Sequence, residues 1–288
     1  MAKDVLGERM KEFYEYIPRT KLMRRVPVAI RIDGKAFHTF TKDFRKPFDR
    51  VLISTMQRTM KYLCENIQGC VLGYTQSDEI TLILVDYKKL NSAAWFDYEI
   101  QKMCSVAASM ATMTFNKVFA EMVEDYKVKC YTNDALSQGV ETQQEQQRYI
   151  EVLCKAVEKG AMFDARVFNI PKEEVTNLIY WRQVDATRNS IQMVGQANFS
   201  HKELQNKSCD MIQDMLFTQK SINWDALPTN LKRGSCCIKI SDSEIEYENG
   251  MIVGASHMRT RWVIDNEIPI FKGEDRQYIE KLINFKEE

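Results

Sequence analysis

The sequence predicts an α+β protein whose antiparallel sheet follows the ferredoxin-like β-α-β-β-α-β order. Three observations predict it. Residues 26–33 alternate as a half-buried strand does, and a helical pattern follows them. Two short β-like runs joined by a tight polar connection then form a hairpin. A second long helical pattern and a final strand, 163–170, complete the order. Many unrelated proteins share this order, so function has to be read from a site.

The first 69 residues are expected to supply a lead-in, a strand and a helix. Residues 1–25 are expected to form a charged helical lead-in. In the strand 26–33, Val28, Ile30 and Ile32 share one face, and Gly34 ends it. Residues 35–48 mix basic and aromatic side chains without a clean period. Asp49 has the character of an N-cap, and the helix that it begins stops at Gly69. The apolar residues at helical spacing between them are Leu52, Met56, Met60, Leu63 and Ile67.

The hairpin strands are expected at 71–74 and 80–85, joined by the polar residues 75–79. A long helix then begins near residue 100, because apolar residues recur there at helical spacing. Further along, the pattern predicts a polar connection over 125–145, a helix over 143–159, a strand over 163–170 stopped by Pro171, and a helix over 172–185. The pattern beyond residue 185 is mixed.

Composition limits the class of protein. The chain has 288 residues, which fits one large domain or a catalytic domain with an elaborated second part. With 44% hydrophobic and 28% charged residues it is an ordinary globular sequence. The formal net charge is zero, which gives no support for a nucleic-acid partner. It does not exclude one, because affinity for nucleic acid follows a local basic groove.

Cysteine usage and hydropathy indicate the compartment. The eight cysteines are scattered without a C-x-x-C pair, as expected for free thiols in a reducing cytosol. The N-terminus is charged and has no apolar core of a signal peptide. No window approaches the roughly 18 uninterrupted apolar residues that a membrane span needs. We therefore expect a soluble cytoplasmic protein that does not bind a membrane.

Acidic residues lie where two predicted strands end. Asp33 ends the first strand, and Asp78 and Glu79 occupy the turn of the hairpin. In a ferredoxin-like sheet the first strand lies beside the hairpin, so these carboxylates are expected to meet. Such a site suits Mg²⁺, which takes substrate phosphates and waters as its other ligands. Two such ions about 3.5–4 Å apart can activate an attacking hydroxyl and stabilise the leaving oxygen at phosphorus.

Taken singly, an Asp before a Gly is more often a turn residue, and Ser-Asp-Glu is more often a solvated hairpin tip. The loop after Asp33 favours the functional interpretation. Gly34 allows a phosphate to approach the backbone closely. His38, which Phe37 and Phe40 flank, could stack on a base. The loop also carries the cations and donors that a triphosphate needs: Lys35, His38, Lys42, Arg45 and Lys46.

Five ordered motifs resemble the tRNA-histidine guanylyltransferase family. The resemblance runs from about residue 26 to 195, with a fainter echo at Leu227-Pro228 and Lys232-Arg233-Gly234. Any one motif alone would be weak, whereas five in order at compatible spacings are specific. The motifs are Arg31-Ile32-Asp33-Gly34-Lys35-Ala36-Phe37-His38, Lys46-Pro47-Phe48-Asp49, Gln76-Ser77-Asp78-Glu79, Phe163-Asp164-Ala165-Arg166 and Trp181-Arg182-Gln183-Val184-Asp185.

The resemblance implies a polymerase-like palm that adds nucleotides to the 5′ end of tRNA, in the 3′–5′ direction. A 5′-monophosphorylated RNA is first activated with ATP or GTP, and the 3′-hydroxyl of a nucleoside triphosphate then attacks the activated phosphate. Family members are typically tetramers with two Mg²⁺ ions. Residues 1–185 would form the palm-like catalytic domain with inserted helices. Residues 186–288 would be a helical and β C-terminal elaboration that contacts RNA or neighbouring subunits.

The resemblance also assigns residues to roles. It implies metal binding by Asp33, Asp78 and the Gly34 carbonyl, with assistance from Glu79. For the nucleotide it implies a cradle of backbone amides from Lys35, Ala36, Phe37 and His38, a base contact by Asp49, and triphosphate contacts by Lys46, Ser77 and Lys102. For the RNA or its activated end it implies Arg166, Arg188, Asn189, Lys232 and Arg233.

The basic pair Lys232-Arg233 and the residues around Trp181 each have an ordinary structural alternative. Lys232-Arg233 before a β-like run is more often a solvated turn than a phosphate grip. Trp181 and its neighbours could position RNA, although a tryptophan on a helix is more often part of the core.

Departures from the family pattern favour one branch of it. Eukaryotic enzymes that add the extra guanosine of tRNA-histidine carry His-Ile-Asn-Asn after Trp-Arg-Gln-x-Asp, where this chain has Thr187-Arg188-Asn189-Ser190. Glu99 lies where that branch tends to be basic. Both changes resemble the bacterial, archaeal and organellar "like" branch, which repairs 5′-truncated tRNAs by template-dependent addition.

Three alternatives to tRNA 5′-end repair remain. The first is a tRNA-histidine guanylyltransferase that adds G at position −1. The second is a nucleotide cyclase or cyclic-dinucleotide synthase, which uses the same palm and metal logic. The third is a catalytically silent RNA-binding module, which would retain tRNA without Mg²⁺ dependence.

Overall fold

An antiparallel sheet organises the protein. The structure, a computed structural model, describes residues 4–131, 142–244, 247–248, 251–252 and 257–285. In the described chain six strands form one sheet, in the order β4-β1-β3-β2-β5-β8. Its first four strands have the ferredoxin-like order, which confirms the predicted fold class. The strands are β1 (Val28–Gly34), β2 (Cys70–Gln76), β3 (Glu79–Leu84), β4 (Phe163–Asn169), β5 (Ser235–Glu244) and β8 (His257–Asp265), and a separate pair joins β6 (Tyr247–Glu248) to β7 (Met251–Ile252).

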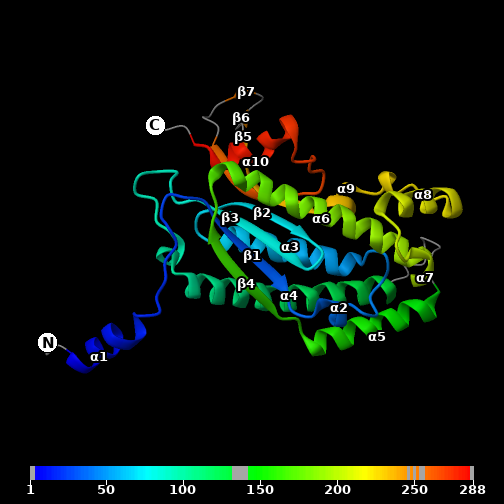
Figure 1. Cartoon of the computed structure of the whole chain (residues 1–288), viewed down its shortest axis with the longest axis horizontal. Helices are drawn as coiled ribbons and strands as arrows, with labels where there is room; N and C mark the ends of the chain where they lie inside the picture. The colour runs from blue at the N-terminus through cyan, green and yellow to red at the C-terminus, as the bar shows by residue number, and fades with distance from the viewer. Residues whose placement is uncertain (1–3, 132–141, 245–246, 249–250, 253–256, 286–288) are drawn as a thin grey trace.

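Helices cover both faces of this sheet (Figure 1). On one face, α3 (Arg50–Asn66) and α4 (Ile100–Tyr131) pack against the apolar side of β1, which carries Val28, Ile30 and Ile32 as predicted. The helix α5 (Gln143–Lys159) packs on α4. On the other face, α6 (Lys172–Asn198) and α10 (Gln277–Ile283) cover β2 and β3. Burial of both faces explains why β2 is buried along its whole length.

Shorter elements connect these layers. They are α2 (Phe37–Phe40), η2 (Trp95–Tyr98), α7 (His201–Leu204), α8 (Cys209–Lys220), η4 (Trp224–Ala226), α9 (Thr229–Arg233) and η5 (Gly273–Arg276). No helix in the described ranges is long and apolar enough to cross a membrane.

Two helices are longer than the sequence predicted. The helix α6 does not end at residue 185 but continues to Asn198, because Ala186, Ile191 and Val194 continue its buried side, and Ile191 and Val194 pack against α8. The expected boundary between residues 185 and 186 therefore lies inside one helix. The helix α4 likewise runs to Tyr131, so the expected polar connection is wrong for residues 125–131, while 132–141 lie outside the described residues.

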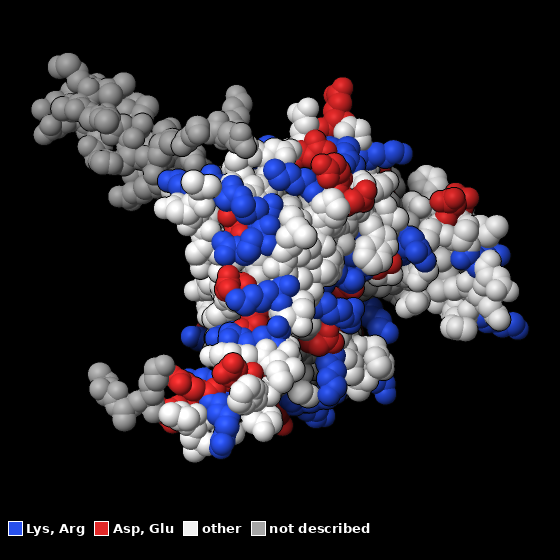
Figure 2. Space-filling view, turned by 60° about the vertical axis from the view of Figure 1, so that its left-hand side comes forward, with Lys and Arg blue, Asp and Glu red and all other residues white. Residues whose placement is uncertain are grey.

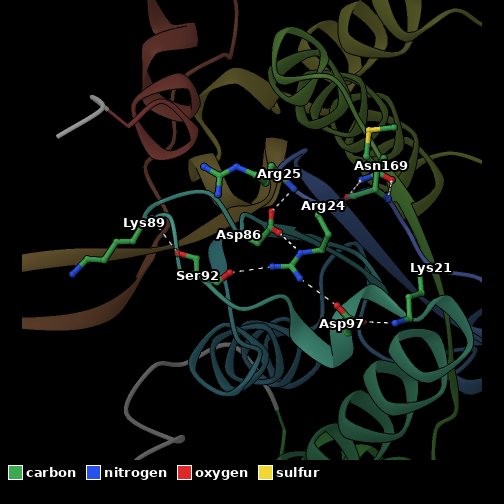
Figure 3. A network of polar contacts seen from close by, with 9 residues as sticks. Lys21, Arg24, Arg25, Asp86, Lys89, Ser92, Asp97 and Asn169 are labelled. Atoms are coloured by element: carbon green, nitrogen blue, oxygen red, sulfur yellow. Dashed lines mark hydrogen bonds and ion pairs between the residues drawn. The ribbon is translucent and has the colours of Figure 1, made fainter.

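The lead-in divides into a free arm and a fixed root. The arm, residues 5–17, consists of α1 (Val5–Met10), η1 (Lys11–Glu15) and the two residues that follow; it buries no residue, and α1 stands clear of the sheet (Figure 1). The root, residues 19–25, is held by polar contacts (Figure 3). Arg24 donates to Asp86 Oδ2 over 2.6 Å and to the Ser92 carbonyl over 3.0 Å, and the Arg25 amide donates to Asp86 Oδ1. The arm is thus anchored at one end only.

Candidate active site

Asp33 and Asp78 come together at one end of the sheet. Asp33 pairs with Glu79 of β3 on one side and with Asp164 of β4 on the other. The Gly34 amide donates to the Asp78 carbonyl over 3.1 Å, which ties the end of β1 to the hairpin turn. The sheet register, and not a flexible loop, therefore sets the separation of the two aspartates.

The two carboxylates repel each other in a partly buried place. Burial raises the pKa of Asp33, the charges of Glu79 and Asp164 raise it further, and Arg166 opposes them. Burial also raises the pKa of Asp78, a hydrogen bond from Ser77 lowers it, and the charge of Asp33 raises it again. In the described part of the chain neither carboxylate has an ion-pair partner within 4.0 Å. Negative charge is concentrated here without a side-chain cation to neutralise it.

This arrangement fits a hard divalent cation. The described residues contain no group of three or more His, Cys, Asp or Glu side chains that could hold a metal by itself. What they offer is two carboxylates beside backbone carbonyls, including that of Gly34. Mg²⁺ is commonly bound by one or two carboxylates, with waters and substrate phosphates completing its octahedron. A cation would also offset the burial and the neighbouring negative charges that raise both pKa values.

Glu79 follows Asp78 in the chain, but its side chain is bound by arginines. Its carboxylate accepts from Arg182 Nε over 2.9 Å and from Gln76 over 3.0 Å, and it pairs with Arg31 over 3.2 Å. Arg182 in turn pairs with Asp185 over 2.7 Å. The Glu79 carboxylate therefore lies between two arginines under α6. Its effect on a cation held by Asp33 and Asp78 would be through its charge.

A cavity of about 650 Å³ opens beside the aspartates. This volume is typical of pockets that enclose small ligands. A narrower pocket of about 90 Å³ adjoins it, sharing Asp49, Leu52, Ser77 and Met193, and runs between α3 and α6. The predicted site residues that line the larger cavity are Gly34, Ala36, Phe37, His38, Lys46, Asp49, Ser77 and Asp78, with Lys42 and Arg45 from the same loop.

The loop after β1 forms a single helical turn. Thr39 and Phe40 both donate to the Ala36 carbonyl, and the N–H groups that precede them have no partner inside so short a helix. Of the four amides expected to cradle phosphates, that of Lys35 is already bonded to the Met162 carbonyl over 2.8 Å. The cradle available in this chain is therefore Ala36 to His38.

The aromatic residues of the loop are structural. Phe37 and Phe40 are buried together among aromatic rings of α4 and β4. Both rings belong to the core, so neither phenylalanine is free to contact a base. Gly34 is required by this packing as well, since a Cβ there would lie 2.2 Å from the Phe37 ring. His38 remains exposed at the cavity wall.

Asp49 caps a helix and fixes the cavity wall. Its carboxylate accepts from the amides of Leu52 over 3.0 Å and Arg45 over 3.1 Å, and from the Tyr149 hydroxyl over 2.5 Å. The expected N-cap is confirmed. Because three donors bind this buried carboxylate, it has a structural role in the cavity wall.

Comparison with known proteins decides the family. The family model for tRNA(His) guanylyltransferase matches residues 7–171. The chain belongs to this family.

Solved structures and curated relatives agree with the assignment. A bacterial tRNA(His) guanylyltransferase-like protein in complex with ATP is 40% identical, with coverage of 98% of this chain and 100% of that one and a TM-score of 0.75. A structure of a bacterial guanylyltransferase-like protein in complex with GTP is 38% identical, covers 97% and 99%, and has a TM-score of 0.68. The probable tRNA(His) guanylyltransferase of Dictyostelium discoideum is 26% identical over 83% of this chain and 86% of its own length. The protein is therefore a guanylyltransferase-like nucleotidyltransferase.

Within one chain of this guanylyltransferase-like enzyme, Lys102 lies away from the cavity. Thr112 of α4 accepts from the Phe163 amide, at the site end of β4. Lys102 lies ten residues earlier on the same helix, about 15 Å along its axis, with its ammonium 5.0 Å from the centre of the Phe96 ring. The structure does not bring it to the other predicted nucleotide contacts.

The residues expected to contact RNA are divided by the structure. Arg166 and Arg188 are exposed, and Asn189 lines the narrower pocket. Lys232 is only 6% exposed and donates to the backbone and side chain of Asp225. The expectation that Lys232 grips RNA is wrong, because its ammonium is already bonded inside the protein. Arg233, beside it, is partly exposed.

Sequence reasoning underrated two residues of α6. Trp181 is 53% exposed rather than part of the core, and Arg182 is the buried partner of Glu79. The signal was present in the heptad-like spacing of α6, since Leu178, Arg182 and Gln183 take the buried side and leave position 181 outside. This side of the helix is hard to recognise from sequence, because arginine is rarely found at a buried position.

Proposed function

We propose that the protein adds nucleotides in the 3′–5′ direction to the 5′ end of tRNA, and that its role is template-dependent repair of 5′-truncated tRNAs. The observation that carries the proposal is the Asp33–Asp78 pair, of which Asp78 lines a nucleotide-sized cavity. Thr187-Arg188-Asn189-Ser190, in place of His-Ile-Asn-Asn, supports repair over addition of a single guanosine. Relatives in complex with ATP and with GTP support the two nucleotide substrates.

The reaction has two displacements at phosphorus. In the first, the 5′-phosphate of the RNA attacks the α-phosphorus of ATP, a P–O bond forms, and pyrophosphate leaves. In the second, the 3′-hydroxyl of the incoming nucleoside triphosphate attacks the 5′-phosphate of the RNA, and AMP leaves. The proton of that hydroxyl is lost to solvent as the new P–O bond forms. The template base opposite the gap selects the nucleotide by pairing.

Two Mg²⁺ ions would be held by Asp33, Asp78 and the Gly34 carbonyl, and when bound they would supply charge stabilisation at the reacting phosphates. The chain's own groups bind and orient the triphosphate. Lys46 and Lys42 line the cavity as cations, and Ala36, Phe37 and His38 line it as well, with amides that have no partner inside their short helix. The Tyr149–Asp49 bond holds the wall that carries Lys46 in place.

Replacement of either aspartate tests the proposal. Asp33→Ala and Asp78→Ala should abolish nucleotide addition while tRNA binding and the thermal midpoint of unfolding stay close to wild type. The assay offers 5′-monophosphorylated tRNAs, either full length or lacking one 5′ nucleotide, with each base opposite the gap. Repair predicts that each template base selects its complement.

Three results would overturn parts of this proposal. Normal turnover by either alanine variant would contradict the metal assignment. Addition of G alone to full-length tRNA-histidine would replace repair by guanylylation at position −1. A cyclic product formed from triphosphates without RNA would indicate a cyclase.

We further propose that the protein assembles with copies of itself into a tetramer, and that the free arm is one of the contacts. The arm exposes large apolar side chains that no described residue covers, and exposed apolar patches of this kind mark interaction sites. Acidic residues outnumber basic ones in it, which disfavours RNA as its partner. The exposed apolar residues are Val5, Leu6, Met10, Phe13, Tyr14, Tyr16 and Ile17.

A further inference from the structure

Part of the sheet face under α6 is open, and it adjoins Asp33. In the register of β1 with β4, Arg31 lies opposite Arg166 and Asp33 lies opposite Asp164. These four side chains share the face that α6 covers elsewhere. On β4, the edge strand, the side chain of Arg166 is 60% exposed and that of Asp164 is 56% exposed. A ligand can therefore reach the surface of the sheet beside Asp33 from this side.

Trp181 forms the wall of this open face. Its indole is an exposed aromatic side chain beside the active site, and the guanidinium carbons of Arg31 and Arg182 lie 5.3 Å and 4.4 Å from the ring centre. Both arginines bind the same carboxylate of Glu79, so the cations that flank the ring are fixed. The result is a rigid aromatic surface that is presented to solvent and bordered by positive charge.

The spacing matches one step along a nucleic-acid strand. Arg31 and Asp33 are two residues apart on the same face of β1, which is roughly 6.8 Å. A nucleotide whose phosphate lies at Asp33 would therefore place a neighbouring base near the ring that stands over Arg31. Aromatic rings bind bases of any identity by stacking, which suits a site that must accept many RNA sequences.

We propose that the open face receives the 5′ end of the RNA substrate, with Trp181 as a stacking surface for a base near that end and Arg166 as a contact to a phosphate. The inference rests on the proposed function and deepens it. Charge favours RNA over a protein partner here. Apart from Asp33, the acids nearby are paired with arginines, Glu79 and Asp185 with Arg182 and Asp164 with Arg166, whereas Arg188 is exposed on the next turns of α6.

The first test separates RNA binding from nucleotide binding. Trp181→Ala should raise both the Kd for 3′-labelled, 5′-monophosphorylated truncated tRNA and the KM for that RNA on the order of tenfold to a hundredfold. The KM for ATP and the kcat at saturating RNA should stay within about twofold. Trp181→Phe should restore most of the affinity, because a phenyl ring also stacks. Phe217→Ala, which removes a 65% exposed ring from α8, is the matched control and should change nothing.

The second test identifies the phosphate contact. Arg166→Gln should reduce the slope of log K against log salt by about 0.7–0.9, the share of one phosphate. Trp181→Ala should leave that slope unchanged while lowering the affinity at every salt concentration.

Each remaining outcome has a distinct meaning. Wild-type RNA affinity in Trp181→Ala would overturn the inference and leave the proposed function intact. A lower molecular mass of Trp181→Ala in solution, with unchanged RNA affinity, would overturn it in favour of a subunit contact. If the wild-type protein binds the RNA through Trp181 but adds no nucleotide, the proposed function fails while the stacking surface stands.

Discussion

Asp78 and Glu79 show how neighbouring acids acquire different roles. Asp78 lies at the hairpin turn, faces the cavity and has no cationic partner among the described residues. Glu79 begins β3, faces α6 and is bound by Arg31 and Arg182. Because Asp78 lies in the turn and Glu79 is the first residue of β3, one residue step separates a carboxylate at the cavity from one that is held by arginines.

Replacing Glu79 with Gln tests this division. We expect Glu79→Gln to lower the free energy of unfolding by about 1–3 kcal/mol, because the buried Arg182 loses a charged acceptor. The Mg²⁺ concentration for half-maximal activity should not change. Urea unfolding and Mg²⁺ titration of activity measure the two quantities. A large rise in the Mg²⁺ requirement with unchanged stability would make Glu79 a metal ligand.

At the residue scale, the sequence could locate Asp33 and Asp78 because one ends a recognisable strand and the other lies in a recognisable hairpin turn. It could not reveal the internal partners of Asp49 and Lys232 or the exposure of Trp181. The partners of Asp49 include Tyr149, one hundred residues away, and that of Lys232 lies in the short helix η4. Which side chains are satisfied internally depends on tertiary contacts that spacing alone does not reveal.

Among the elements, the start of α3 matters most for the cavity. Asp49 caps this helix and at the same time joins it to α5 through Tyr149 and to the preceding loop through the Arg45 amide. One carboxylate thus holds three segments that form the wall opposite the aspartates. The cap was predictable from the sequence, but its links to the loop and to α5 were not.

We expect Asp49→Ala to lower the free energy of unfolding by about 2–4 kcal/mol, because the helix loses its cap and two buried donors lose their acceptor. Tyr149→Phe removes one of these bonds and should cost only about 0.5–1.5 kcal/mol. Denaturant unfolding measures both. Unchanged stability of Asp49→Ala with altered preference among the four nucleoside triphosphates would instead support a base contact.

Helix lengths mark the limit of element prediction. The ends of α4 and α6 were misplaced because charged and polar residues, such as 124–129 and 187–189, interrupt the apolar period while remaining compatible with a helix. Helices with Gly or a capping motif at an end were placed well, as at Thr142 and Gly160 of α5. Sequence signals for helix ends are local, whereas the burial that prolongs a helix depends on contacts with residues far away in the sequence.

For the whole molecule, strand order was predictable because alternation and hairpin spacing are strong signals. The addition of β5 and β8 beside β2 was not, since it depends on pairing over 160 residues of separation. Charge patterning agrees with the zero net charge. Figure 2 shows Lys and Arg interspersed with Asp and Glu on the face that it draws, so that face does not present one continuous basic surface.

The arm gives a prediction for assembly. A double substitution, Phe13→Ser with Ile17→Ser, should lower the molecular mass in solution, because the arm would lose apolar area that a second copy covers. Light scattering measures the mass. Leu90→Ser, at a site that is 91% exposed, is the control and should leave the mass unchanged. A double variant with the wild-type mass would show that the arm does not hold subunits together.

The pairing of β1 with β3 also restricts how this chain can change in length during evolution. An insertion or deletion of one residue between Val28 and Asp33 would turn the aspartate to the opposite side of the sheet and bring an apolar neighbour to the reaction centre. Insertions in the connections at 86–94 or after Lys159 leave the register of β1 with β3 unchanged. Variation in loop length among homologues is therefore compatible with activity, whereas variation within these few strand positions is not.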